Sequence, residues 1–276
     1  MREARGRMKR RASAALTACA LGAALLAVSA EPATAQSSDP ADLQAAGPKT
    51  LVIHYRADPD KRAAFRTFMA GPHAAQLRKL EQERRIDGFR TFFSWYAQPT
   101  VWDAMVEIRF SDFAAVAEWN RIERSMPGGL SADGLALGRP VQTMLADTSW
   151  SGGRNDDDAA AANSVYYVIP YTYQKADEYR DYVAGYAVPQ YEGWLKAGLL
   201  SGYEVLMNRH PVGDPDPWDA LLILRYRDLD SFGKRQHILD EVRKGLRQQP
   251  AWLAWHERKG QIRSEAENSI VDLVAN

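Results

Sequence analysis

The sequence of 276 residues contains a single cysteine, Cys19, which lies near the amino terminus. The rest of the chain therefore has no residue for a disulfide, a thiol nucleophile or a thiolate metal ligand. No His-x-x-x-His or His-Glu-x-x-His spacing occurs, so there is no local signature of a zinc or non-haem iron site. A glycine-rich phosphate loop and a nucleophile elbow are also missing. We therefore expect packing alone to stabilise the fold, and no motif identifies a reaction.

An excess of positive charge is missing as well. The whole chain has 35 Lys and Arg against 35 Asp and Glu, and without residues 1–35 the balance is 29 against 33. A mildly acidic protein lacks the basic surface that binding to phosphate backbones requires. Nucleic acid is therefore not an expected partner.

Residues 1–35 have the pattern of an export signal peptide, with a basic start, an apolar run from Ala12 to Ala30 and small residues before Gln36. No basic stop-transfer segment follows, so we expect cleavage before Gln36, no transmembrane anchor in the mature chain and a periplasmic or secreted location. A lipoprotein box ending at Cys19 and a twin-arginine route through Arg10-Arg11 are the alternatives. Residues 36–49 are expected to form a flexible segment.

The sequence does contain an internal repeat. Gly71 and Gly88 recur as Gly185 and Gly202, at a constant offset of 114 residues. The segment Trp102-Asp103-Ala104 likewise returns as Trp218-Asp219-Ala220. Such self-similarity indicates one supersecondary unit used twice. We predict units over residues 50–150 and 164–276, joined by a soluble linker over 151–163 that begins Ser-Gly-Gly.

Both units are predicted to have the element order β-α-β-β-α-β. Asp58 as N-cap and Pro59 at the first helical position predict the start of the first helix. Pro72 and Pro189 are expected to kink or interrupt the first helices. The pattern of apolar and turn-forming residues predicts strands at 51–55, 89–96, 101–110, 141–145, 165–169, 203–210, 218–226 and 269–274, second helices at 113–124 and 229–246, and an additional helix at 252–262.

This arrangement resembles the dimeric α/β-barrel superfamily, which includes NIPSNAP-like, EthD-like and antibiotic-biosynthesis monooxygenase-like proteins. The resemblance covers most of the mature chain. It implies an α+β fold in which two tandem ferredoxin-like units form an intramolecular pseudo-dimeric α/β barrel, as in the duplicated chlorite dismutase-like branch. In segment 218–226 one face of the predicted strand is fully apolar, and the opposite face carries Leu221 and Ile223 between Asp219 and Arg225. This pattern fits a strand that is covered by helices outside and by another sheet inside.

His73 is the candidate catalytic residue. It follows Met69 and precedes Leu77 by four residues each, which places it on the apolar side of the first predicted helix. There it could act as a general base over a cavity between helix and sheet. The counterpart of His73 in the second unit is Ala187, so any activity would belong to one unit. A buried structural histidine is the alternative interpretation.

The candidate ligand-binding residues are aromatic or imidazole side chains: His54, Trp102, Tyr167, His210 and Trp218. The repeated Trp-Asp pairs could form cavity walls and polar anchors at the barrel rim, or pack under helices and set turns. A dense group of tyrosines in the second unit could line a pocket for a flat apolar ligand or simply form core.

We therefore expect an exported protein that binds a small, partly aromatic molecule, as a monomer or a homodimer. The resemblance implies two oxidative alternatives. One is a cofactor-independent monooxygenase that uses His73 with Trp102, and the other is a haem-dependent oxidoreductase with His210 or His237 as axial ligand. No haem-ligand motif is recognisable, so no cofactor is the first expectation and haem the second. A structural or interaction module is a further alternative.

Overall fold

The computed structural model describes residues 48–98, 100–153, 163–210 and 218–276, without the side chains of Arg209 and His210. The predicted export signal and most of the predicted flexible segment lie outside these residues. No helix in the described part of the chain combines the length and the apolar character needed to span a membrane.

The described elements of the first half follow the order expected from the sequence. The strands are β1 (Lys49–Ala57), β2 (Gly88–Ser94), β3 (Ala104–Phe110) and β4 (Gly138–Gly153). The helical segments are η1 (Pro59–Lys61), α2 (Arg62–Phe68), η2 (Met69–His73), α3 (Ala74–Gln82), α4 (Phe113–Glu123), η3 (Pro127–Gly129) and α5 (Ala132–Leu135).

The second half has the same order with more helix. Its strands are β5 (Val165–Tyr173), β6 (Leu200–His210), β7 (Ala220–Tyr226), β8 (Arg263–Glu265) and β9 (Ser269–Ala275). Its helical segments are α6 (Ala176–Tyr182), η5 (Val183–Ala187), α7 (Val188–Lys196), α8 (Leu229–Gly233), α9 (Arg235–Leu246) and α10 (Pro250–Ile262). The predicted helix 252–262 is thus present as α10, whereas the predicted helix 229–246 is divided into α8 and α9 at Lys234.

The strands form one antiparallel sheet that closes on itself. Their order is β7-β6-β4-β1-β3-β2-β9-β5, and β5 pairs again with β7. Strand β8 extends this sheet by pairing with the last residues of β5. The two halves meet at two seams, where β4 pairs with β6 and β2 pairs with β9. Closure pairs the backbone groups that an open sheet would leave free at its edges.

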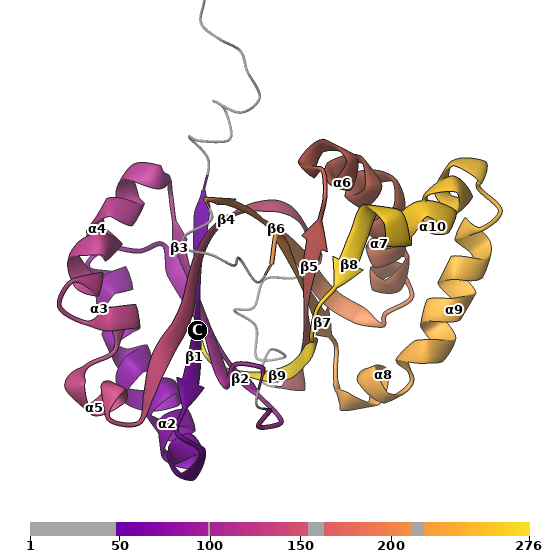
Figure 1. Cartoon of the computed structure of the whole chain (residues 1–276). Coiled ribbons are helices and arrows are strands. Elements are labelled where there is room, and N and C mark those ends of the chain that lie inside the picture. The colour runs from indigo at the N-terminus through magenta and orange to yellow at the C-terminus, as the bar shows by residue number, and fades with distance from the viewer. Residues whose placement is uncertain (1–47, 99, 154–162, 211–217) are drawn as a thin grey trace, which may run out of the picture. The chain divides into compact units, whose positions relative to one another are not determined.

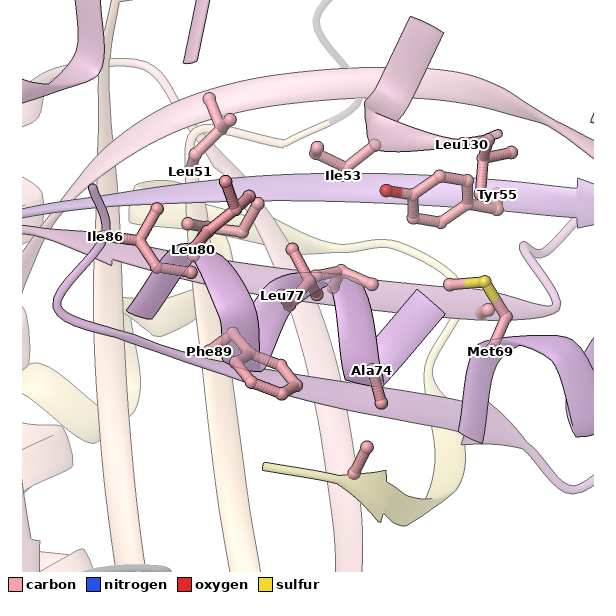
Figure 2. Packing of buried hydrophobic residues seen from close by; sticks show 14 of the residues in the cluster. Leu51, Ile53, Tyr55, Met69, Ala74, Leu77, Leu80, Ile86, Phe89 and Leu130 are labelled. Carbon is pink, nitrogen blue, oxygen red and sulfur yellow. The ribbon is translucent and has the colours of Figure 1, made fainter. Parts of the chain in front are cut away.

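Side chains along each strand alternate between the inside of this barrel and the helices outside. Helices α2 to α5 lie beside β1 and β3, and α6 to α10 lie beside β5 and β7 (Figure 1). Figure 2 shows the outer core of the first half, where Leu77 and Leu80 of α3 face Ile53 of β1 and Phe89 of β2. Full burial of one such side chain contributes about 1.5–3 kcal/mol to the free energy of folding.

The first helix of each half contains a π-helical segment where the sequence predicts a break. Segment η2 joins α2 to α3 and contains Pro72, and η5 joins α6 to α7, whose first turn contains Pro189. The α-helical pattern is thus interrupted at each position, but the chain stays helical, because the wider π turn leaves one backbone acceptor unused and a proline without N–H is tolerated there. Asp58 does precede the first helical turn, but its side chain binds Lys61 Nζ at 2.9 Å and makes no capping bond.

The closing strand of the first half is much longer than predicted. Strand β4 continues through Ser151, Gly152 and Gly153, which pair with residues 202–204 of β6 and are strand rather than linker. A Cβ on Gly152 would lie 2.6 Å from the ring of Tyr203, so glycine allows this close approach. The remaining predicted linker residues up to 162 lie outside the described residues.

Candidate functional site

His73 is enclosed between η2, β1 and the η3 turn. Its ring packs near Tyr55 and Phe68, with ring centroids 6.1 and 6.2 Å away. The side chain is fully buried, and neither ring nitrogen has a hydrogen-bond partner in the described part of the chain. Burial lowers the pKa of His73 to about 4, so the imidazole is neutral at neutral pH and is a weak base. Its position on the apolar helix face is as predicted, whereas catalysis by His73 stays a prediction.

His54, Trp102 and Trp218 belong to the inside of the barrel. The His54 ring stacks on Trp102 with centroids 5.0 Å apart, and His54 Nδ1 lies 2.8 Å from Gln142 Oε1. Burial lowers the pKa of His54 to about 4, although the bond to Gln142 acts in the opposite direction. Trp218 is part of the apolar cluster that fills the barrel, and Trp102 packs against that cluster. Both tryptophans therefore face the barrel interior and do not lie under helices.

The aspartates of the repeated Trp-Asp pairs fasten the ends of β1 and β5. Asp103 Oδ2 accepts a hydrogen bond from the Ala57 backbone N–H at 2.9 Å, and Asp219 Oδ2 accepts one from Tyr173 at 2.8 Å. Asp103 also receives Arg62 Nε at 2.6 Å. The two halves use the same residue for the same backbone contact, so the repeated aspartate is a structural residue.

A charged cluster inside the barrel connects the two halves. Arg90 of β2 donates from Nε to Glu107 Oε2 at 2.6 Å and also pairs with Glu204 of β6. Burial raises the pKa of Glu107 to about 7, although the positive charge of Arg90 opposes this shift. Because Glu204 comes from the second half, this cluster ties β2 and β3 to the opposite side of the barrel.

A cavity of about 330 Å³ lies between the sheet and the helices of the second half. Residues of β5, β7, α6, η5, α7 and α9 line it, together with Lys259 of α10 and the β8 strand. Eight of its twenty lining residues are aromatic: Tyr167, Tyr171, Tyr179, Tyr182, Tyr186, Tyr191, Trp194 and Tyr226. Of the predicted ligand-binding residues, Tyr167 lies here, His54, Trp102 and Trp218 lie inside the barrel, and the side chain of His210 is outside the described residues.

Several of these rings stack along one side of the cavity. Tyr182 and Tyr186 have centroids 4.9 Å apart, and Tyr186 stacks on Trp252 at 4.6 Å. Tyr186 also shares a hydrogen bond with His256, whose Nδ1 lies 3.0 Å from the phenol oxygen. Burial raises the pKa of Tyr226 to about 12 and of Tyr179 well above its usual value, so these phenols are neutral at neutral pH.

The rim of the cavity is cationic. Arg235, Arg243, Lys259 and Arg263 belong to the lining, against Glu265 as its one described carboxylate. The tyrosines of the helices are buried, whereas Lys259 and Glu265 are exposed, so the cavity opens to solvent at its charged rim. None of these cations is among the binding residues predicted from the sequence. The signal for them is the spacing of Arg235, Leu239 and Arg243 by four residues, which places them on one face of α9.

The lining does not fit a haem held by histidine, because the described lining contains no histidine. His256 Nδ1 is engaged with Tyr186, and His237 is exposed on α9. Among the residues that the structure describes, no group of three or more His, Cys, Asp or Glu side chains is placed to hold a metal ion.

No protein-family model matches this chain, and no curated protein matches it. A solved structure of a candidate monooxygenase from Fusobacterium nucleatum has a TM-score of 0.51 at 13% identity and covers 83% of this chain and 93% of its own. A candidate monooxygenase from Lactobacillus acidophilus scores 0.48 at 11% identity, covering 83% and 97%. A chlorite dismutase from Candidatus Nitrospira defluvii scores 0.46 at 9%, covering 84% and 92%. The first likeness shows the fold alone, and it confirms a mixed α/β fold of the ferredoxin-like, dimeric α/β-barrel type.

Proposed function

We propose that the protein binds a small, partly aromatic molecule in the tyrosine-lined cavity of its second half. The observation that carries this proposal is the cavity itself, a hollow of about 330 Å³ whose lining combines eight aromatic side chains with aliphatic and charged ones. Ligand sites typically combine apolar walls with a few polar groups that orient the ligand. Ring faces offer stacking, and phenol groups that donate and accept hydrogen bonds supply orientation.

We further propose that the protein is exported and that its two halves form a pseudo-dimeric barrel within one chain. The signal pattern of residues 1–35 supports export to the periplasm or beyond the cell. Two observations support an intramolecular pseudo-dimer: the order of elements is repeated, and strands of one half pair with strands of the other at two seams. Because one chain supplies both halves, a monomer is sufficient and a homodimer is an additional assembly.

A thermal-shift screen with small aromatic compounds tests the binding. A compound present at a hundred times its Kd should raise the unfolding temperature by about 5 °C or more. Leu239→Trp would place a large ring at the cavity rim and should abolish that shift, whereas His237→Trp on the same helix should retain it. If a broad panel produces no shift in the parent protein, the binding proposal fails and an interaction module is favoured.

A second candidate function is oxidation of a phenolic compound by dioxygen without a cofactor. The bond between Tyr186 and His256 favours it, because the neutral imidazole could receive a phenol proton relayed from the cavity. Burial and the nearby charge of Lys259 both lower the pKa of His256, which keeps it neutral. Oxygen uptake that depends on an added phenol and decreases in His256→Phe would support this function. Uptake that is equal in both proteins would remove His256 from it.

A further inference from the structure

We infer that the ligand of the tyrosine-lined cavity is an aromatic carboxylate, and that Lys259, Arg243 and Arg263 receive its anionic group. The inference rests on the proposed function, because it names the chemical class of molecule for the same cavity. It is carried by the charge of the rim and by the way in which the rim side chains are held.

The rim has more positive charge than its own carboxylate can neutralise. Glu265 is paired with Arg263, whose Nη1 lies 3.2 Å from Glu265 Oε2. Arg235, Arg243 and Lys259 form no ion pair with a carboxylate in the described part of the chain. Like charges gathered at the mouth of a partly apolar cavity repel each other. An anion placed among them attracts each of them and so offsets this repulsion.

Lys259 lies within this group of like charges. Its pKa is lowered, first by partial burial and then by the positive charges of Arg243, Arg263 and Arg247. Nothing in the fold requires a lysine at this position, because the side chain is exposed near the end of α10. A bound carboxylate would give the ammonium group the partner that it lacks.

The two arginines are held in place before any ligand binds. Arg243 donates from Nε to Gln190 Oε1 at 2.9 Å, and its guanidinium carbon lies 5.5 Å from the centroid of the Trp194 ring. Arg263 lies 4.2 Å over the Tyr171 ring and donates from Nε to Tyr182 at 3.1 Å. Arg243 therefore still offers its terminal N–H groups, which match the geometry of a carboxylate, whereas Arg263 offers Nη2 because its Nη1 pairs with Glu265.

The floor of the cavity favours a flat ring behind the anionic group. Tyr182, Tyr186 and Tyr191 are buried in the lining, and burial raises the pKa of each phenol, so none becomes an anion that would repel a carboxylate. Trp194 also belongs to the lining, and its Nε1–H has no acceptor among the described residues. The donors at the rim and the aromatic faces below them therefore match the two ends of an arylcarboxylate.

Calorimetric titration of the mature protein with 2-naphthoate and 2-naphthamide tests the inference. These probes share the aromatic body and differ in charge. We expect 2-naphthoate to bind about tenfold more tightly at low salt, because charge-assisted bonds are roughly twice as strong as neutral ones. The advantage should shrink at high salt, where the exposed part of the rim is screened.

Lys259→Met and Lys196→Met form a matched pair for the same titration. Lys259→Met should weaken 2-naphthoate binding about fivefold and leave 2-naphthamide unchanged, as expected for one partly exposed charge pair. Lys196 is exposed on α7 outside the lining, so Lys196→Met should change neither. Equal affinity of the two probes, or equal effects of the two variants, would overturn the inference and leave the binding proposal standing. Failure of every aromatic probe in the parent would instead refute the proposed function.

Discussion

The outer layers of the two halves contain the same elements but differ in how they are filled. In the first half, Leu77 and Phe65 are fully buried against β1, and even His73 is enclosed without a polar partner among the described residues. In the second half, the corresponding space between helix and sheet holds a cavity of about 330 Å³ under Tyr182 and Tyr186. The first half also has a hollow, a groove of about 420 Å³, but it lies between α3 and α4 and not beneath the first helix. One backbone plan therefore accommodates two arrangements of the space between the first helix and the sheet, and the side chains decide which of them forms.

The segment after the second helix explains much of this difference. In the first half, short turns approach the helices closely, and a Cβ on Gly129 or Gly134 would lie 2.7 or 2.6 Å from a neighbouring ring. In the second half, the longer helices α9 and α10 occupy this region and carry Arg243 and Lys259 to the cavity rim. Close glycine contacts occur in both layers, since a Cβ on Gly185 or Gly193 would lie 2.7 or 2.5 Å from Trp255 or Val242. The difference lies in the long, charged side chains that α9 and α10 bring to the cavity rim.

The largest difference between the halves should appear when a leucine is shortened in each. Leu77→Ala removes a fully buried side chain from the closed layer, and we expect the free energy of unfolding to decrease by about 3 kcal/mol. Leu239→Ala trims a half-buried residue beside an existing cavity and should cost about 1 kcal/mol. Urea denaturation measures both values. Equal losses would show that the second layer is packed as tightly as the first.

Replacing His73 should change how the free energy of unfolding depends on pH, because the buried imidazole titrates. The second half has no equivalent contribution at this position, since the counterpart of His73 is Ala187. Burial lowers the pKa of His73 from 6.5 to about 4, so the unfolded chain binds the proton more readily between these pH values. Stability should therefore decrease as the pH falls from 6.5 to 4, by about 3 kcal/mol for this residue.

Denaturation of His73→Leu and of the parent protein across this pH range isolates the contribution of His73. His54 has a similarly lowered pKa and remains in both proteins. Glu107, whose pKa is raised to about 7, acts with the opposite sign, because its stabilisation is lost as the pH rises from 4.5 to 7. The difference between the two curves should therefore grow toward acidic pH, and parallel curves would refute the buried, neutral state of His73.

Adding a methyl group to a glycine should lower the free energy of unfolding where the new Cβ meets a ring, and should not do so where the Cβ meets open space. Gly134→Ala would place a Cβ 2.6 Å from Phe68, and we expect a loss of about 2 kcal/mol from overpacking. Gly245→Ala in α9 meets nothing within 4 Å and should stabilise that helix by up to about 1 kcal/mol. Thermal unfolding of both variants checks this contrast, and a neutral Gly134→Ala would mean that Phe68 moves freely.

The smallest effects should come from half-exposed ion pairs at the surface of each half. Glu118 pairs with Arg85 and with Arg121, each at 2.5 Å, in the first half, and Glu178 pairs with Arg258 at 2.5 Å in the second. Replacing either glutamate by glutamine should cost less than about 1 kcal/mol, because solvent screens these pairs. Chemical denaturation at low and high salt should show similarly small losses. A large loss of unfolding free energy at either site would contradict this prediction and would show that the ion pair is not screened by solvent.

The sequence was sufficient for the order of elements because β-branched runs and hairpin turns are local signals, and because the repeat at Gly71 and Gly185 can be read from the sequence alone. It was not sufficient for the length of β4, because Gly152 and Gly153 are typical of a loop until a distant strand supplies their hydrogen-bond partners. Nor could it show that His73 is enclosed. The seams between the halves depend on contacts that are remote in sequence.

The cavity was only partly predictable for a similar reason. Tyr179, Tyr182 and Tyr186 give the same helical pattern whether their rings fill the space or surround it. Only the distance between α6, α9 and the sheet distinguishes these cases, and that distance is set by tertiary packing. The cationic rim combines Arg243 of α9 with Lys259 of α10 and Arg263 of β8, so no single local motif contains it.

The pairing of β2 with β9 has a consequence for synthesis on the ribosome. Strand β2 is translated early, but β9 lies at residues 269–275, at the far end of the described chain. Strand β4 likewise has to wait for β6. A first half that is made before β6 and β9 has two sheet edges without partners, and such edges readily join strands of other chains. The edge at β4 is covered once β6 is available, and the edge at β2 only once β9 is available.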